Sequence, residues 1–89
     1  MRLDHIKVRS MRNVVMVADG MTVSQVAKRQ NTSPAGISLA IRRTEAIVGE
    51  PIFTRGAHKI TGVTESGRVV VEQFRAAIRA LYSEEQEAA

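Results

Sequence analysis

The chain contains no cysteine and no tryptophan, and its 89 residues include only three aromatic side chains. Without cysteine it can form neither a disulfide nor a zinc site held by thiolates. Its longest uninterrupted apolar run is the five residues 14–18, far below the ~20 that a helix needs to cross a bilayer. The first ten residues also lack the apolar stretch of a secretory signal. We therefore expect one cytoplasmic domain, because 89 residues leave no room for a second.

Acidic residues are scarce outside the C-terminal end. Residues 1–82 contain 13 Lys and Arg and six Asp and Glu, which gives a net charge of +7. The last seven residues contain three Glu and no Lys or Arg, so their net charge is −3. A basic body of this kind favours a polyanion as the partner. Proteins that bind single strands stack bases on several aromatic rings, so the scarcity of aromatics favours double-stranded DNA. No amphipathic helix with clustered cations and aromatics points to a membrane surface.

Apolar spacing and capping residues predict three helices in the first half of the chain. Residues 5–19 carry apolar side chains at the three- and four-residue intervals of a helix with one buried face. A short second helix begins at residue 22, and a third spans about residues 34–48. The boundary signals are Gly20, the capping box of Thr22 with Gln25, the N-cap Ser33 before Pro34, and Gly49.

The periodicity changes after the third helix. Residues 52–63 contain two β-branched or aromatic stretches on either side of Gly56-Ala57-His58, a pattern that predicts a short hairpin. Thr64 caps a last helix that runs to about residue 85. The expected fold is mainly α with a small β-hairpin, in the order α-α-α-β-β-α. This order describes a winged helix-turn-helix, with a DNA-binding body and wing at residues 5–63 and a long C-terminal helix at residues 64–85.

The chain resembles the N-terminal DNA-binding domain of LysR-type transcriptional regulators over roughly residues 8–82. The resemblance depends on the order and spacing of several short motifs. These are Val8, Met11, Val14 and Val17-Ala18-Asp19; Val26-Ala27-x-Arg29; Ser33, Ile37-Ser38, Ile41 and Glu45; Gly49-x-Pro51-Ile52-Phe53-x-Arg55; and Thr64-Glu65-x-Gly67. The resemblance implies a DNA-binding transcription regulator that acts in the cytoplasm on the nucleoid.

The chain departs from the family pattern at several positions. Pro34 and Ala40 stand where the family usually has glutamine, and Gln30, Thr32 and Thr44 stand at usually apolar positions. The family's small-molecule-binding domain of ~200 residues is absent, so we expect no effector site in these residues. A stand-alone module and a piece of a longer regulator both remain open.

A helix-turn-helix places its second helix in the major groove, so we expect residues 34–48 to read bases. The hairpin at residues 52–63 is expected on the adjacent groove or backbone. Candidate DNA contacts are the polar, basic and outward-facing residues of the helix starts, the third helix and the hairpin. They are Thr22, Ser24, Ser33, Pro34, Ala35, Ser38, Leu39, Arg42, Arg43, Arg55, His58 and Lys59.

Some of these candidates also have a structural interpretation. Thr22 and Ser33 serve equally well as helix caps. Arg55 can pair with Glu45 instead of, or as well as, contacting DNA. Arg42 suits either a bidentate contact to guanine or a phosphate contact.

The last helix carries an apolar stripe that is wide enough to pack on the body and still leave a face for a second subunit. The helix is long for so small a body to cover, which favours a homodimer over the alternative that one domain buries the whole stripe. In the resembled family its counterpart pairs two subunits. The stripe consists of Val70, Phe74, Ile78 and Leu81.

Two further hypotheses stay open beside the homodimeric regulator. The chain could be an interaction module that pairs with a full-length regulator and modulates it, or a small architectural factor that directs recombination. An enzyme is not expected, because no nucleophile has a recognisable partner and no His, Asp or Glu group has metal-ligand spacing. We accordingly expect no cofactor and no metal.

Overall fold

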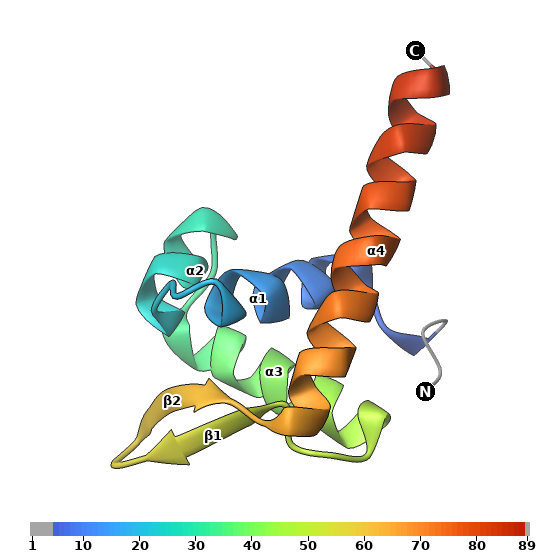
Figure 1. The fold of residues 1–89 in the computed structure, drawn as a ribbon. Helices are drawn as coiled ribbons and strands as arrows, with labels where there is room; N and C mark the ends of the chain where they lie inside the picture. Colours follow the sequence, from blue (N-terminus) through green and yellow to red (C-terminus); the bar gives the residue numbers. More distant parts are fainter. Residues whose placement is uncertain (1–4, 89) are drawn as a thin grey trace.

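The computed structural model describes the backbone of residues 5–88 and the side chains of residues 5–82. The predicted element order is confirmed, whereas the first helix is shorter than the expected 5–19 because Lys7 has an extended backbone. In chain order the elements are α1 (Val8–Ala18), α2 (Val23–Arg29), α3 (Pro34–Val48), β1 (Phe53–Gly56), β2 (Lys59–Val63) and α4 (Glu65–Ala88) (Figure 1).

The predicted helix caps are confirmed. Thr22 Oγ1 accepts the Gln25 N–H at 3.1 Å, and Gln25 Oε1 accepts the Thr22 N–H at 2.9 Å, which completes the capping box. Ser33 Oγ accepts the Gly36 N–H at 3.0 Å at the start of α3. Gly49 ends α3 with φ of 87°, a conformation that glycine adopts without a side-chain clash.

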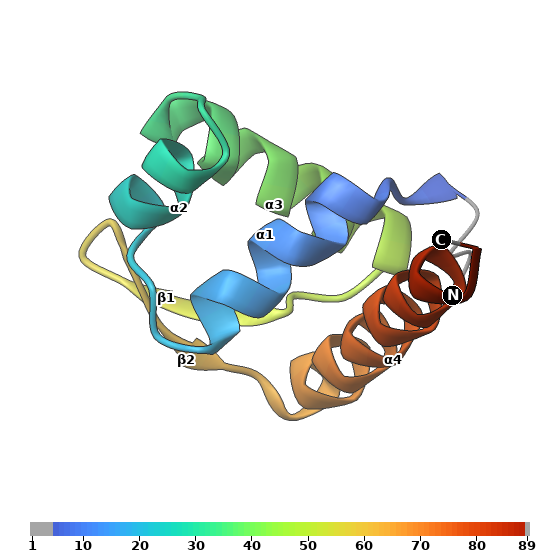
Figure 2. The same ribbon diagram turned by 90° about the horizontal axis from the view of Figure 1, so that it is seen from above.

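The core lies between the helices and the first wing strand. Seen from above, α1 runs between α4 on one side and the α2–α3 pair on the other (Figure 2). This arrangement lets α1 bury one face against three helices, as its apolar spacing predicts. The largest fully buried side chains are Val14, Val26, Ile37, Ile41, Ile52 and Phe74.

A polar pair joins a buried asparagine of α1 to the half-buried glutamine that ends α2. Asn13 of α1 is only 3% exposed, and its Oδ1 accepts a hydrogen bond from Gln30 Nε2 at 2.8 Å. The same Gln30 amide lies 3.5 Å from the Arg9 carbonyl oxygen. Among the described residues, every buried side-chain nitrogen or oxygen has a hydrogen-bond partner. The unusual glutamine at position 30 is therefore accommodated by a specific acceptor on α1.

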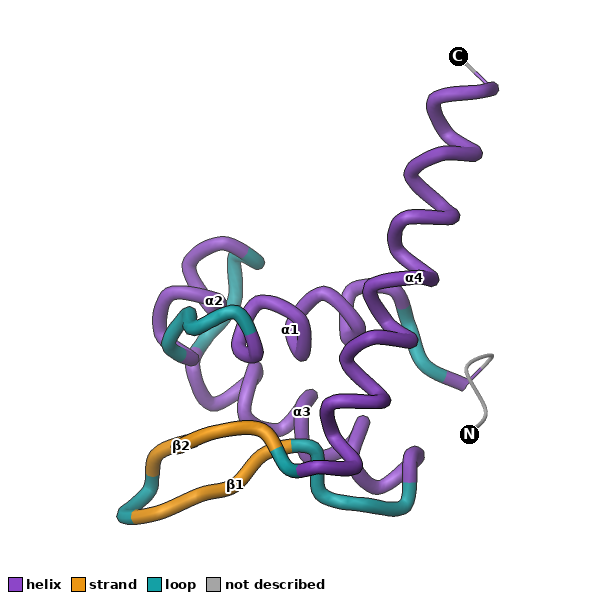
Figure 3. The backbone as a smooth tube through the Cα atoms, in the orientation of Figure 1, coloured by secondary structure: helices purple, strands orange, loops and turns teal. Residues whose placement is uncertain are grey.

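The wing is a two-stranded antiparallel hairpin (Figure 3). Its register shifts between Thr54 and Arg55, as in a β-bulge, which re-aims the side chains that follow. Ala57 and His58 form the turn and both have positive φ, 48° and 69°. A two-residue turn with positive φ at both positions matches the right-handed twist of a hairpin, although glycine and asparagine fill it more often.

The start of α4 is fixed against the connection between α3 and the wing. Thr64 Oγ1 accepts the Gly67 N–H at 2.8 Å and donates to the Pro51 carbonyl, whose oxygen lies at 2.7 Å. A Cβ at position 67 would lie 2.2 Å from the Ile52 carbonyl oxygen. Only glycine fits where helix and chain approach so closely.

The packing of α4 corrects the expected dimer stripe. Val70 and Phe74 are 6% and 0% exposed, because they pack into the chain's own core. They are therefore unavailable to a second subunit. Ile78 is half-buried at the edge of that core, whereas Leu81 is 38% exposed. The C-terminal part of α4 extends beyond the rest of the body and gives the molecule a longest dimension of 45 Å (Figure 1).

An ion pair joins the C-terminal end of α1 to the middle of α4. The Arg75 guanidinium donates two hydrogen bonds to the Asp19 carboxylate, and its Nε lies 3.4 Å from Glu72 Oε1. The hydrogen bonds and charge of Arg75 hold the pKa of Asp19 below its ordinary value, against a smaller opposing effect of burial. The contact fixes α4 against α1 at the protein surface.

Candidate nucleic-acid interface

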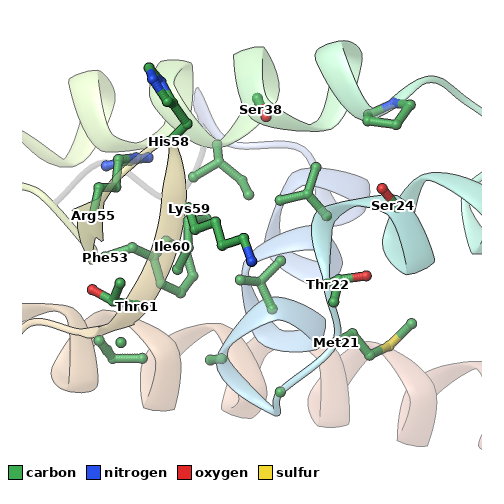
Figure 4. A pocket seen from close by; sticks show the side chains of 18 of the residues that line it. Met21, Thr22, Ser24, Ser38, Phe53, Arg55, His58, Lys59, Ile60 and Thr61 are labelled. Atoms are coloured by element: carbon green, nitrogen blue, oxygen red, sulfur yellow. The ribbon is translucent and has the colours of Figure 1, made fainter.

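A cleft of about 890 Å³ separates the helix-turn-helix from the wing (Figure 4). Its floor is apolar and includes Ile41, Phe53 and Ile60. Lys59 extends from β2 across the cleft towards the start of α2, where Thr22 lies (Figure 4). Eight of the twelve candidate DNA contacts line this one cleft, although they come from four elements and two turns. They are Thr22, Ser24, Pro34, Ser38, Arg42, Arg55, His58 and Lys59.

The other four candidates lie outside the cleft, at the start or on the outer face of α3. Ser33, Ala35, Leu39 and Arg43 are all exposed. The Ser33 side chain caps α3, so the structural interpretation of this residue is correct. Its hydroxyl proton is still able to donate, because the cap uses the oxygen only as an acceptor.

The cleft carries positive charge on both of its walls. Arg42 lies on α3, whereas Arg55 and Lys59 lie on the wing. None of the described residues that line the cleft is acidic. The hydroxyls of Thr22 and Ser24 at the start of α2 add hydrogen-bond donors. Cations and hydroxyls arranged in this way suit the phosphate backbone of a duplex.

Glu45 connects α3 to the wing. Its Oε2 accepts the backbone N–H of Ile52 at 2.7 Å and that of Phe53 at 3.2 Å. Its Oε1 accepts Arg55 Nη2 at 2.8 Å, while Nη1 of the same guanidinium lies 3.3 Å from Oε2. The expected pairing of Arg55 with Glu45 is thus confirmed. One carboxylate fixes both the first wing strand and a cation of the cleft.

The environment of Glu45 favours its ionised form. Burial alone would raise the pKa of this carboxyl, but the hydrogen bonds from Arg55, Ile52 and Phe53 outweigh it together with the Arg55 charge. The pKa of Glu45 therefore lies below its ordinary value. At neutral pH the connection between α3 and the wing is a charge-assisted one.

Sequence reasoning anticipated the Glu45–Arg55 pair but missed the other contacts that hold these elements together. The missed contacts are the two backbone hydrogen bonds of Glu45, to residues seven and eight positions on, and the Asn13–Gln30 and Arg75–Asp19 pairs, which join residues 17 and 56 positions apart. The only available signals were a buried-face glutamate and an asparagine among the apolar residues of the first helix.

Other kinds of site find no support in the described residues. No group of three or more His, Cys, Asp or Glu side chains in that part of the chain lies close enough to hold a metal ion. No described helix combines the length and apolar character of a membrane span.

Comparison with solved structures gives the same fold. Full-length OxyR C199D from Pseudomonas aeruginosa superposes with a TM-score of 0.84 at 21% identity, over 94% of this chain and 28% of that one. The CbnR_DBD structure, a complex with DNA, gives 0.82 at 20% identity and covers 93% and 94% of the two chains. BenM_DBD bound to benA site 1 DNA gives 0.82 at 16% identity, with coverages of 93% and 92%. The chain thus spans little more than a quarter of OxyR but nearly all of the two DNA-binding domains.

A search of curated proteins found no match to this chain. The model of the family "Bacterial regulatory helix-turn-helix protein, lysR family" matches residues 8–68, which include the helix-turn-helix, the wing and the start of α4. This is a family of DNA-binding transcription regulators and not of enzymes. The chain belongs to the lysR family of bacterial regulatory helix-turn-helix proteins and has its winged DNA-binding fold.

Proposed function

We propose that the chain reads a specific sequence in double-stranded DNA as a homodimer and thereby regulates transcription at the bacterial nucleoid. The observation that carries the proposal is the cleft, because eight candidate contacts from separate elements converge on it. Residues 34–48 occupy the major groove, and residues 52–63 lie on the adjacent groove or backbone. One sugar-phosphate strand then runs between the two, through the cleft.

The individual roles follow from position and chemistry. Arg42 is exposed on α3 and reaches a guanine edge or the phosphate beside it. Lys59 and His58 on the wing, together with Thr22 at the start of α2, hold the phosphates. Arg55 shares its guanidinium with Glu45, so it contributes fewer free donors and a fixed orientation.

The dimer contact is proposed on the outer side and the free end of α4. Its 24 residues extend for ~36 Å, and the core of the body reaches along it only as far as Ile78. Val69, Leu81 and Tyr82 are large apolar or aromatic residues that are 60%, 38% and 57% exposed. Val69 also lines a shallow apolar hollow with Ala76. A second copy of α4 packed here would cover carbon surface that the monomer exposes to water.

Sequencing of genomic fragments that the purified 89-residue protein binds at about physiological salt tests the proposal. A paired motif with half-sites about one helical turn apart supports a sequence-reading dimer. Diffuse binding without a motif, or no binding, contradicts it. Stoichiometric capture of a full-length regulator without DNA binding would instead favour the interaction module. A strongly bent complex at recombination sites would favour the architectural factor.

Sedimentation equilibrium tests the dimer separately. Leu81→Asn removes an exposed apolar side chain from the free end of α4 and is expected to shift the protein towards monomer. The matched control is Ile47→Asn, which removes an apolar side chain of similar exposure, 42%, from α3. Equal effects of the two variants would contradict the α4 contact.

A further inference from the structure

The outer face of α3 is apolar in its N-terminal half. Ala35 and Leu39 lie one helical turn apart and are both exposed, and Leu39 is 49% accessible. Arg42 and Arg43 follow on the next turn, and Ser38 lies on the side of the cleft. A helix in the major groove directs this outer face at the base edges, so an exposed leucine stands where base-reading side chains are expected.

The helix lacks the side chains that usually read adenine and cytosine. Its fifteen residues include no Asn or Gln, whose amides read adenine, and one carboxylate, Glu45. Glu45 is buried and held by Arg55, so it cannot accept from a cytosine amino group. Arg42, Arg43 and Ser38 remain for hydrogen bonding. The apolar pair can recognise only one feature of the major groove, the C5-methyl group of thymine.

We propose that Leu39, supported by Ala35, determines specificity by packing on the C5-methyl group of a thymine in each half-site. The inference rests on the proposed function, because it requires α3 to enter the major groove. Leu39 and Arg42 are separated along the helix axis by ~4.5 Å, and base pairs are stacked about 3.4 Å apart. The thymine therefore lies within about two base pairs of the base or phosphate that Arg42 contacts.

Replacement of thymine by deoxyuridine tests this inference directly. Deoxyuridine removes the methyl group and leaves the pairing edge unchanged. Each thymine of the selected half-site is replaced in turn, and the affinity of the 89-residue protein for each duplex is measured by fluorescence anisotropy. We expect one position at which the replacement weakens binding about four-fold, the effect of losing one buried methyl-sized group.

Two variants assign the effect to Leu39. Leu39→Ala is expected to bind the thymine and deoxyuridine duplexes equally at that position, while its thermal unfolding stays close to that of the wild type because the side chain is exposed. Ile47→Ala, the control at the other end of the same helix, is expected to retain the four-fold difference.

Three results separate the inference from the proposed function. A deoxyuridine effect that persists in Leu39→Ala, or the absence of any such effect at a well-bound site, overturns the role of Leu39 and leaves DNA binding intact. The absence of a bound motif overturns the proposed function, and the inference falls with it.

Discussion

Truncation of the two partners in the Glu45–Arg55 pair is expected to have very unequal effects on stability. Glu45→Ala removes the acceptor of two backbone N–H groups, those of Ile52 and Phe53, as well as the partner of Arg55. Arg55→Ala leaves the Glu45 carboxylate with both backbone donors. The side chain of Arg55 is 27% exposed and that of Glu45 is 10% exposed, so the ion pair itself is partly accessible to water, and the difference between the variants comes from the two backbone hydrogen bonds of Glu45.

The magnitudes follow from the contacts. A buried N–H group left without an acceptor costs about 1–3 kcal/mol, so Glu45→Ala is expected to cost about 3–5 kcal/mol in total. Arg55→Ala loses a partly exposed ion pair worth about 1 kcal/mol. A domain of this size is stable by about 4–13 kcal/mol, so the glutamate variant approaches the limit of folding.

Urea unfolding followed by circular dichroism at pH 7 gives both free energies of unfolding. We expect the cost of Glu45→Ala to exceed that of Arg55→Ala by at least about 2 kcal/mol. Arg55→Ala is expected to weaken DNA binding while the protein stays folded. Equal costs for the two variants would refute the view that Glu45 fixes the wing through the backbone.

Three further predictions concern stability. Because folding lowers the pKa of Glu45, its contribution to the free energy of unfolding is complete above the ordinary pKa of 4.5 and is lost as the pH falls below that value. Glu45→Gln should therefore make the urea midpoint depend less on pH in this range. An unchanged pH dependence would contradict the stabilising role of the ionised Glu45 carboxylate. Gly67→Ala places a Cβ against the Ile52 carbonyl and should lower stability by about 1–3 kcal/mol in thermal unfolding; a neutral result would show that the helix start can shift. His58→Gly relieves a positive φ and should raise stability by about 1 kcal/mol in urea, whereas a loss would show that the side chain stabilises the turn.

Local signals in the sequence predict the helix ends well. The caps at Thr22, Ser33 and Gly49 depend on side chains or conformations within three residues of the helix end, so the sequence around them determines the outcome. The alternation of the wing strands and the glycine before the turn are similarly local. These features, taken in order, were sufficient to predict the winged fold.

Tertiary packing decided what the local pattern left open. The stripe of Val70 and Phe74 fits a dimer contact and an internal core equally well, and only the position of α4 against α1 places both residues inside. The Arg75–Asp19 pair joins residues 56 positions apart, and no spacing rule could anticipate it. Nor does any local pattern indicate that the Glu45 carboxylate accepts hydrogen bonds from the backbone N–H groups of Ile52 and Phe53.

The most direct test of the DNA interface compares the loss of two arginines of equal charge. Arg42 lines the cleft, whereas Arg12 is exposed on α1 and lies outside it. The affinity of Arg42→Ala and Arg12→Ala for the selected duplex is measured by anisotropy at several salt concentrations. A lost base contact of roughly 1–3 kcal/mol predicts about a 5- to 150-fold weaker complex for Arg42→Ala, with a near-wild-type affinity for Arg12→Ala. Equal losses in the two variants would contradict the assignment of the cleft as the DNA interface.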